Sequence, residues 1–131
     1  MNEEFYNIVS LIHQEDSRYH PDAYEFVMEA LSFGQKKFKQ SRHITGHQFL
    51  DGIKALLMKN FGPMTIPVLD RWGIKNTEDF GNIIFNLEQY KIIARDKDDQ
   101  YETFKDVYDF KEVFDAGYRK ELAKRLKTMR F

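Results

Sequence analysis

The chain of 131 residues has the size of one domain, and a domain of that size buries enough surface to fold without a metal or a disulfide. It contains no cysteine, which excludes disulfides, thiolate catalysis and zinc sites built on cysteine. Hydrophobic residues at 42%, charged residues at 31% and a net charge of −1 are ordinary values for a globular protein.

The N-terminal stretch carries acidic residues where a secretory signal peptide needs basic ones, and its apolar residues are spaced rather than continuous. No window approaches the roughly 20 consecutive apolar residues of a membrane span. We therefore expect a cytoplasmic protein without a transmembrane segment.

Two amphipathic helices are predicted at the N-terminus. Apolar residues recur at helical spacing from Phe5 to Ile12, and this pattern ends near Asp16. A second helix is expected to begin at Pro21, because proline is tolerated in the first turn, and its apolar stripe runs on to Phe38. Each helix has one apolar face, so both need to be covered by other parts of the fold.

The third helix has the clearest start signal in the chain. Thr45 and Gln48 have the spacing of a capping box, in which each side chain bonds to the backbone of the other. Apolar residues then recur at helical spacing from Phe49 to Phe61. The following Gly62-Pro63 is expected to end the helix, because proline disfavours a helical conformation in the residue before it.

A short helix, a tight turn and a longer helix follow, in the order of a winged helix-turn-helix. Thr65 is the expected cap of the fourth helix, and Gly73 is its expected C-terminal stop. Thr77 is the expected cap of the fifth helix. Together with the third helix, these elements predict a winged-helix-like three-helix unit.

Residues 92–107 admit two interpretations. Ile92-Ile93 and the stretch 101–107, joined by an acidic turn at 96–99, would form a small β-hairpin, which is the wing of such folds. The apolar residues of 101–107 nevertheless fall nearer to helical than to alternating spacing, which favours a short helix. The sequence leaves both interpretations open.

The predicted fold is therefore mainly α. Residues 1–115 form a single globular domain, in which the two N-terminal helices pack on the winged-helix-like unit. Residues 116–131 form a basic C-terminal tail with helical spacing. The charge is unevenly placed, because residues 77–115 hold five basic and eleven acidic side chains whereas the tail holds six basic and one acidic.

The fifth helix is poorly equipped to read DNA. Affinity for DNA comes mainly from Lys and Arg on phosphates, and residues 77–90 contain neither. We therefore predict that the protein does not bind DNA through this helix. The side chains expected to face outward are Glu78, Asp79, Asn82, Asn86, Glu88 and Gln89.

The tail is a candidate polyanion-binding element. Its basic residues are Arg119, Lys120, Lys124, Arg125, Lys127 and Arg130, and its apolar stripe is Tyr118, Leu122, Leu126 and Met129. Such a helix can bind RNA, an anionic membrane surface or an acidic protein groove. Alternatively, the tail docks on its own acidic neighbour or stays solvated.

No cofactor, metal or catalytic residue is predicted. His43 and His47 have the i, i+4 spacing of helical zinc ligands, but His43 precedes the cap at Thr45, so the two rings do not share a helix face. The acidic turn at 96–99 lacks the glycine and the glutamate that a calcium loop requires. No nucleophile elbow or phosphate-binding glycine loop is present.

Several short motifs together resemble the bacterial Minf-type family of short uncharacterised proteins, over about residues 1–115. The resemblance implies no activity, cofactor or catalytic residue. It singles out Arg18, Tyr19 and His43 either as cap and loop residues or as members of a shared binding site. The motifs are Arg18-Tyr19, Ala23-Tyr24-Glu25-Phe26-Val27, His43-Ile44-Thr45-Gly46, Phe61-Gly62-Pro63-Met64, Trp72-Gly73-Ile74, Thr77-Glu78-Asp79-Phe80-Gly81, Ile84-Phe85-Asn86-Leu87 and Tyr108-Asp109-Phe110.

The high aromatic content, with 12 Phe, 7 Tyr and 1 Trp, fills a core and leaves a surplus for a partner surface or a homodimer. The leading hypothesis is a non-enzymatic module that binds a protein partner through an acidic, aromatic-rich surface. One alternative is a nucleic-acid-associated protein that uses the basic tail. A second alternative is a small enzyme with a pocket of perturbed titratable groups.

Overall fold

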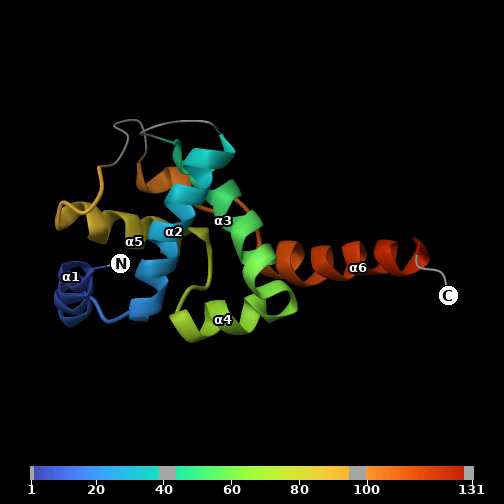
Figure 1. Ribbon diagram of the computed structural model, residues 1–131, viewed down its shortest axis with the longest axis horizontal. Coiled ribbons are helices and arrows are strands. Elements are labelled where there is room, and N and C mark those ends of the chain that lie inside the picture. The colour runs from blue at the N-terminus through green and yellow to red at the C-terminus, as the bar shows by residue number, and fades with distance from the viewer. Residues whose placement is uncertain (1, 39–43, 95–99, 129–131) are drawn as a thin grey trace.

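The computed structural model describes residues 2–38, 44–94 and 100–128, and over these residues it is mainly helical and contains no strand (Figure 1). The prediction of a mainly α chain is confirmed. In chain order the elements are α1 (Glu3–Glu15), α2 (Pro21–Lys37), α3 (Gly46–Phe61), the 3-10 turn η1 (Gly62–Met64), α4 (Thr65–Trp72), α5 (Thr77–Gln89), the 3-10 turn η2 (Tyr101–Phe104), the π-helical turn η3 (Lys111–Ala116) and α6 (Gly117–Thr128).

Local signals place several helix ends correctly. Pro21 opens α2, and the ring of His20 caps it by accepting a hydrogen bond from the Asp22 amide at 3.0 Å. Thr45 and Gln48 form the predicted capping box of α3. Each of these signals depends on neighbouring residues alone, which is why the sequence reveals it.

Two predicted caps are wrong. Thr65 is fully buried and its hydroxyl donates to the carbonyl oxygen of Gly62 at 2.8 Å, so it closes the η1 turn instead of capping α4. The cap of α5 is Asn76, one residue earlier than predicted. Thr77 is also buried, and its hydroxyl donates to the Phe104 carbonyl at 2.6 Å. A buried hydroxyl needs a partner, and here the partner is 27 residues away along the chain.

The region proposed as a wing shows no strand in its described part. Residues 101–104 form the η2 turn, whose buried Phe104 packs against α5. The acidic turn at 96–99 lies outside the described residues. Of the two interpretations, the short helix therefore agrees with the described residues 101–104.

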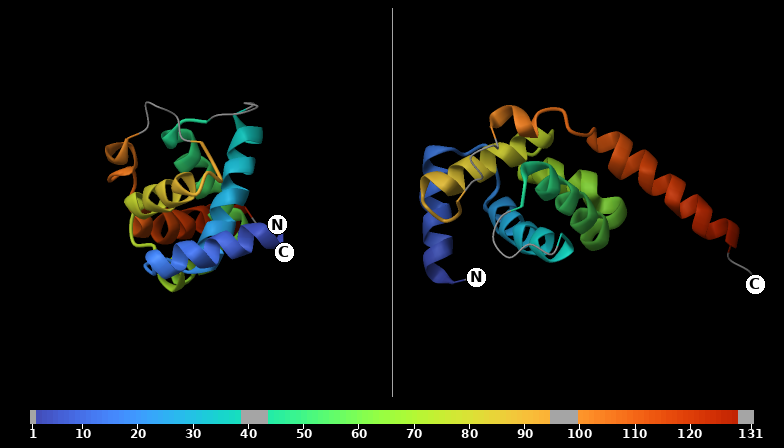
Figure 2. Two further views of the ribbon diagram at one scale, coloured as in Figure 1. Left: turned by 90° about the vertical axis from the view of Figure 1, so that its left-hand side faces the viewer. Right: turned by 90° about the horizontal axis from the view of Figure 1, so that it is seen from above.

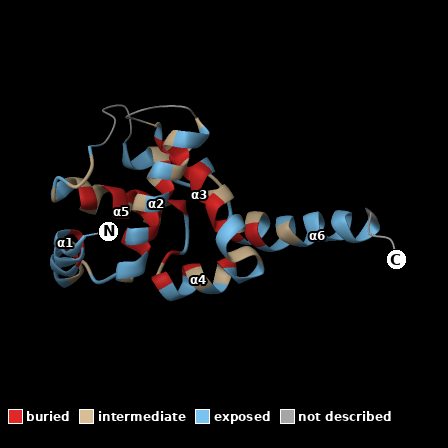
Figure 3. Cartoon of the chain, in the orientation of Figure 1, coloured by how far each residue is buried: buried red, intermediate tan, exposed pale blue. Residues whose placement is uncertain are grey.

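Helix α2 lies at the centre of the fold and contacts α1, α3, α4 and α5. Ten aromatic residues are buried and five more pack against the core, as expected. The buried positions lie where the helices face one another (Figure 3). Two ring clusters dominate the core, with centroids about 5 to 6 Å apart, a separation typical of favourable aromatic pairs. Their members are Phe26, Phe61 and Trp72 in the first cluster and Phe80, Tyr108, Phe110 and Phe114 in the second.

Helix α6 projects from this body along the longest axis of the molecule (Figures 1 and 2). The buried rings of Phe110 and Phe114 anchor the chain just before it, and the π-helical turn η3 leads directly into it. Every described side chain from residue 119 to 127 is exposed. In the described part of the chain, no helix is long and apolar enough to cross a membrane.

Replacing Gly73 with alanine tests how tightly the α1–α2 turn is packed. Gly73 has a left-handed φ of 81°, and a Cβ there would collide with the carbonyl oxygen of Arg18. We expect Gly73→Ala to lower the free energy of unfolding by at least about 2 kcal/mol in urea titrations. Gly117→Ala is the matched control, because an added Cβ meets nothing closer than 3.4 Å and alanine favours helix. Equal effects of the two substitutions would contradict this packing.

Candidate functional site

A polar junction joins the α1–α2 turn to the fifth helix. The backbone N–H of His20 donates to the carbonyl oxygen of Trp72 at 3.0 Å, and the ring of His13 lies 3.0 Å from the carbonyl oxygen of Tyr19. These contacts hold the turn beside the loop that separates α4 from α5. In this position the side chains of Asp16 and Tyr19 reach α5 and form hydrogen bonds with it.

Asp16 and Arg18 form the outer part of this junction. The guanidinium of Arg18 donates to both carboxylate oxygens of Asp16, at 2.9 and 2.7 Å. The side-chain amide of Asn86 donates to the same carboxylate at 3.0 Å. The Arg18 hydrogen bonds, together with the one from Asn86, hold the pKa of Asp16 well below its usual range despite partial burial.

Tyr19 forms the inner part. Its side chain is 1% exposed, and its hydroxyl donates to a carboxylate oxygen of Asp79 while accepting from the Asn82 amide at 2.9 Å. The second Asp79 oxygen accepts from the backbone N–H groups of Lys75 and Asn76, so one carboxylate serves both the capping box of α5 and Tyr19. Burial, reinforced by the nearby Asp79, raises the pKa of Tyr19 far above its ordinary value.

The junction corrects the predicted orientation of α5. Asn86 also donates to the hydroxyl of Tyr24 on α2 at 3.0 Å, so Asp79, Asn82 and Asn86 all bind the α1–α2 turn or the start of α2. These three side chains are half-buried, whereas the sequence predicted that they face outward. The reason is that their partners lie 60 to 70 residues earlier in the chain, beyond the reach of a local pattern.

The predicted shared-site residues are only partly placed. Arg18 and Tyr19 meet in the junction, where the Arg18 guanidinium lies 5.2 Å from the centre of the Tyr19 ring. His43 lies outside the described residues. The sequence did not identify Asp16, Asp79, Asn82 and Asn86 as members of this site. Among the described residues, no group of three or more side chains is arranged to hold a metal ion.

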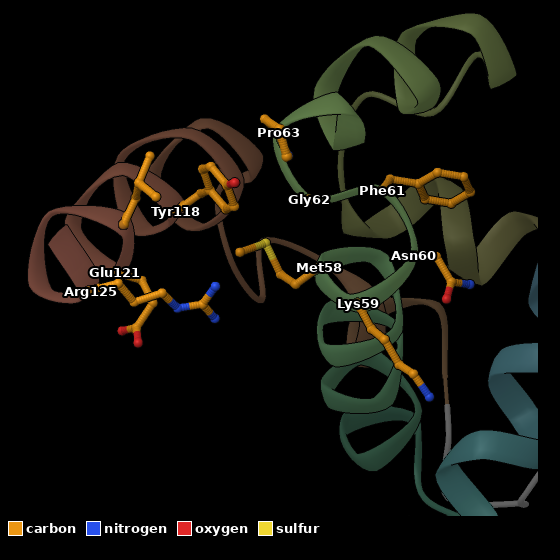
Figure 4. Close-up of a pocket in the computed structure, with 10 residues that line it drawn as sticks. Met58, Lys59, Asn60, Phe61, Gly62, Pro63, Tyr118, Glu121 and Arg125 are labelled. Carbon is orange, nitrogen blue, oxygen red and sulfur yellow. The ribbon is translucent and has the colours of Figure 1, made fainter. Parts of the chain in front are cut away.

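A groove opens where α6 leaves the body (Figure 4). It has a volume of about 450 Å³ and lies between the end of α3, the η1 turn and the first half of α6. Met58 and Tyr118 supply apolar surface, and Glu121 and Arg125 lie next to each other on its α6 side. The groove therefore continues the surface of α6 onto the body of the protein.

The candidate polyanion-binding residues lie on α6, apart from Arg130, which is outside the described residues. Arg119, Lys120, Lys124 and Lys127 are exposed, and Arg119 forms an ion pair with Asp115 at 3.0 Å. Arg125 lines the groove. Helix α6 points away from the body and does not lie over the acidic helix α5 of the same molecule (Figure 2).

Comparisons with known proteins identify no relative. No protein-family model matches the chain, and neither a curated protein nor a solved structure matches it. The resemblance to the Minf-type family therefore stays a prediction. Any function has to be inferred from the junction, the groove and α6.

Removing the Tyr19 hydroxyl tests the energetic role of the junction. Tyr19→Phe leaves the Asn82 amide and an Asp79 oxygen without their shared partner inside the fold. We expect the free energy of unfolding to fall by about 1 to 3 kcal/mol. Tyr101→Phe is the matched control, since that hydroxyl makes an exposed bond to Glu78 and its loss should cost less than about 0.5 kcal/mol. A smaller effect at Tyr19 than at Tyr101 would refute the role of the junction.

The lowered pKa of Asp16 predicts a pH dependence of stability. A carboxylate with a lowered pKa in the folded state stabilises the fold above its unfolded pKa of about 3.9, and this contribution is lost as the pH falls through the folded pKa. We expect the wild-type chain to be more stable than Asp16→Asn at pH 7, with the difference shrinking below about pH 4. Urea unfolding across this pH range measures it, and a difference independent of pH would be the opposing result.

Proposed function

We propose that this chain is a non-enzymatic protein-interaction module and that α6 is its binding element. The observation that carries the proposal is the projection of α6 with two large apolar side chains in solvent. Leu122 is 40% exposed and Leu126 is 59% exposed. When a partner covers apolar surface on a projecting helix, that surface is removed from water and the free energy falls.

The pattern of α6 indicates how a partner would bind. Tyr118, Leu122 and Leu126 recur every four residues, so they lie along one side of the helix. Basic side chains flank this stripe. An amphipathic helix of this kind fits an apolar groove with an acidic rim, because the apolar stripe supplies burial and the opposite charges select the partner.

The proposed binding element differs from the one expected from the sequence. An acidic, aromatic-rich surface requires exposed aromatic side chains, and most rings are instead in the core. The exposed large hydrophobic residues of the described chain are Tyr6, Leu11, Met64, Tyr101, Leu122 and Leu126. The aromatic surplus is thus used for packing, and we assign the interaction to α6.

We further propose that the helix-turn-helix order of α4 and α5, which suggests a winged-helix-like unit, has a structural role. Support comes from the polar face of α5, since Asp79, Asn82 and Asn86 are bonded to the α1–α2 turn. The amide N–H groups that make these bonds cannot also donate to base edges unless the junction opens. We therefore expect that α5 does not read DNA.

The enzyme alternative is less well supported. The groups with the largest pKa shifts include Asp16, Tyr19 and Tyr108; none of them lines the groove, and Tyr108 alone of the three lines a smaller pocket of about 160 Å³. Tyr108 has a pKa raised by burial, and its hydroxyl donates to the Leu50 carbonyl at 2.7 Å. These groups are engaged in holding the fold together, so their shifts have a structural cause.

Nucleic-acid association through the tail remains a second candidate, because Lys120, Lys124 and Lys127 are exposed on α6. A nucleic acid would bind through phosphates with a steep salt dependence. It would not need the apolar side chains of α6. A protein partner would therefore contact Leu126, whereas a nucleic acid would not need to.

Site-specific crosslinking tests the proposal. We expect a photoreactive amino acid in place of Leu126 to form protein adducts in expressing cells, because a partner covers this position. The same amino acid in place of Asp70, an exposed residue of α4, is the control and should form few adducts. In a further variant the photoreactive amino acid stands at a neighbouring α6 position. Adding Leu126→Ala to that variant should reduce adduct formation.

Two outcomes would contradict a protein partner. Adducts at residue 126 that disappear on nuclease treatment would assign α6 to nucleic acid instead. Equal adduct formation at residues 70 and 126 would show that α6 has no preferred partner.

A further inference from the structure

We propose that the partner of α6 is a second copy of this chain, whose N-terminal helices α1 and α2 receive it in a reciprocal two-fold dimer. This inference rests on the proposed function, because it uses α6 as the binding element. It adds the identity of the partner and the surface that α6 meets. Charge, exposed apolar surface and the direction of α6 support it.

Opposite charges gather at the two ends of the molecule. Residues 3–37, which span α1 and α2, hold seven acidic side chains and three basic ones, and two of the basic ones, Lys36 and Lys37, lie in the last turn of α2. The described part of α6 holds five basic side chains and one acidic side chain. Helix α1 and the start of α2 lie at one end of the longest axis, and α6 forms the other end (Figures 1 and 2).

The acidic end also has exposed apolar surface. Tyr6 is 44% exposed and Leu11 is 50% exposed on α1. The pKa of Tyr6 is raised by partial burial and by the neighbouring carboxylates of Glu25 and Asp22. An apolar ring among carboxylates is thus present at one end, and Leu122 and Leu126 among basic side chains are present at the other.

A single molecule does not bring these two surfaces together. The buried rings of Phe110 and Phe114 fix the chain before α6, and η3 passes into α6 without a loop. Helix α6 therefore points away from α1, as Figure 1 and the right panel of Figure 2 show. The complementary surfaces can meet only between two copies.

The arrangement of the two copies follows from charge and size. Pairing α6 with another α6 would bring two basic helices together, which is unfavourable. Twelve residues of α6 span about 18 Å, so one α6 contact is smaller than a typical stable interface. In a two-fold dimer, α6 of each copy meets α1 and α2 of the other copy, so the contact is made twice. Closed two-fold dimers are the commonest symmetric assembly.

The first test is the mass of the purified, nuclease-treated chain in solution. We expect a dimer in sedimentation equilibrium at about 0.1 M salt and a shift toward monomer at about 1 M, where the Debye length falls from about 10 to 3 Å. A monomer at every salt and protein concentration would overturn the dimer. A dimer that disappears on nuclease treatment would also overturn it, since a polyanion would then be the bridge.

Charge reversal locates the contact. Lys120→Glu/Lys124→Glu on α6 and Glu3→Lys/Glu25→Lys on the acidic end should each weaken dimerisation by about tenfold or more, because like charges then face each other. All four residues are exposed, so circular dichroism should show that both variants stay folded. Lys91→Glu/Lys105→Glu, also exposed, is the matched control and should leave the dimer intact.

Mixing the two reversed variants gives the sharpest result. In a mixed pair the reversed α6 faces a reversed acidic end, and the unchanged α6 faces an unchanged acidic end. Opposite charges then meet at both contacts. The mixture should therefore form dimers at a protein concentration at which each variant alone is monomeric. Failure to restore the dimer in the mixture would refute the proposed contact.

The two proposals fail in different ways. If the purified chain is monomeric but residue 126 crosslinks to a different protein, the second copy is wrong and the interaction module stands. If residue 126 forms no specific protein adduct and the chain is monomeric, both are wrong. Adducts at residue 126 with α1 or α2 of another copy would support both.

Discussion

The fold depends above all on the hydrogen-bonded junction between the α1–α2 turn and α5. One carboxylate, Asp79, caps α5 and also accepts from the buried hydroxyl of Tyr19. Asn82 and Asn86 complete the contact from the same face of α5. A buried polar group costs free energy unless it is paired, so this face of α5 is stable only with the N-terminal helices in place. The junction thus fixes how the two halves of the domain meet.

The same junction shapes the surface that is left for function. It occupies the side chains of Asp79, Asn82 and Asn86 on one face of α5, and it holds the acidic N-terminal helices at one end of the molecule. The aromatic anchors Phe110 and Phe114 direct α6 away from the other end. The two ends of the molecule thus carry opposite charge and each has exposed apolar side chains, Tyr6 and Leu11 at one end and Leu122 and Leu126 at the other.

Local chemistry explains which helix boundaries the sequence reveals. The capping box at Thr45, the proline at position 21 and the left-handed Gly73 each depend on residues within one turn, and each is confirmed. Thr65 and Thr77 are threonines, a residue type that often caps helices, yet both are buried and their hydroxyl groups bond to other partners. Burial depends on the assembled fold, so a threonine before a helix does not by itself identify the cap.

The sequence by itself determined the helical class, the uneven distribution of charge, the amphipathic pattern of α6 and the lack of Lys and Arg on residues 77–90. These are properties of composition and of spacing within a few residues. Only the tertiary structure decided that Asn82 and Asn86 face inward and that α6 projects. The physical reason is that both outcomes depend on partners or anchors brought together by packing, with Asn86 bonded to an aspartate 70 residues earlier in the chain.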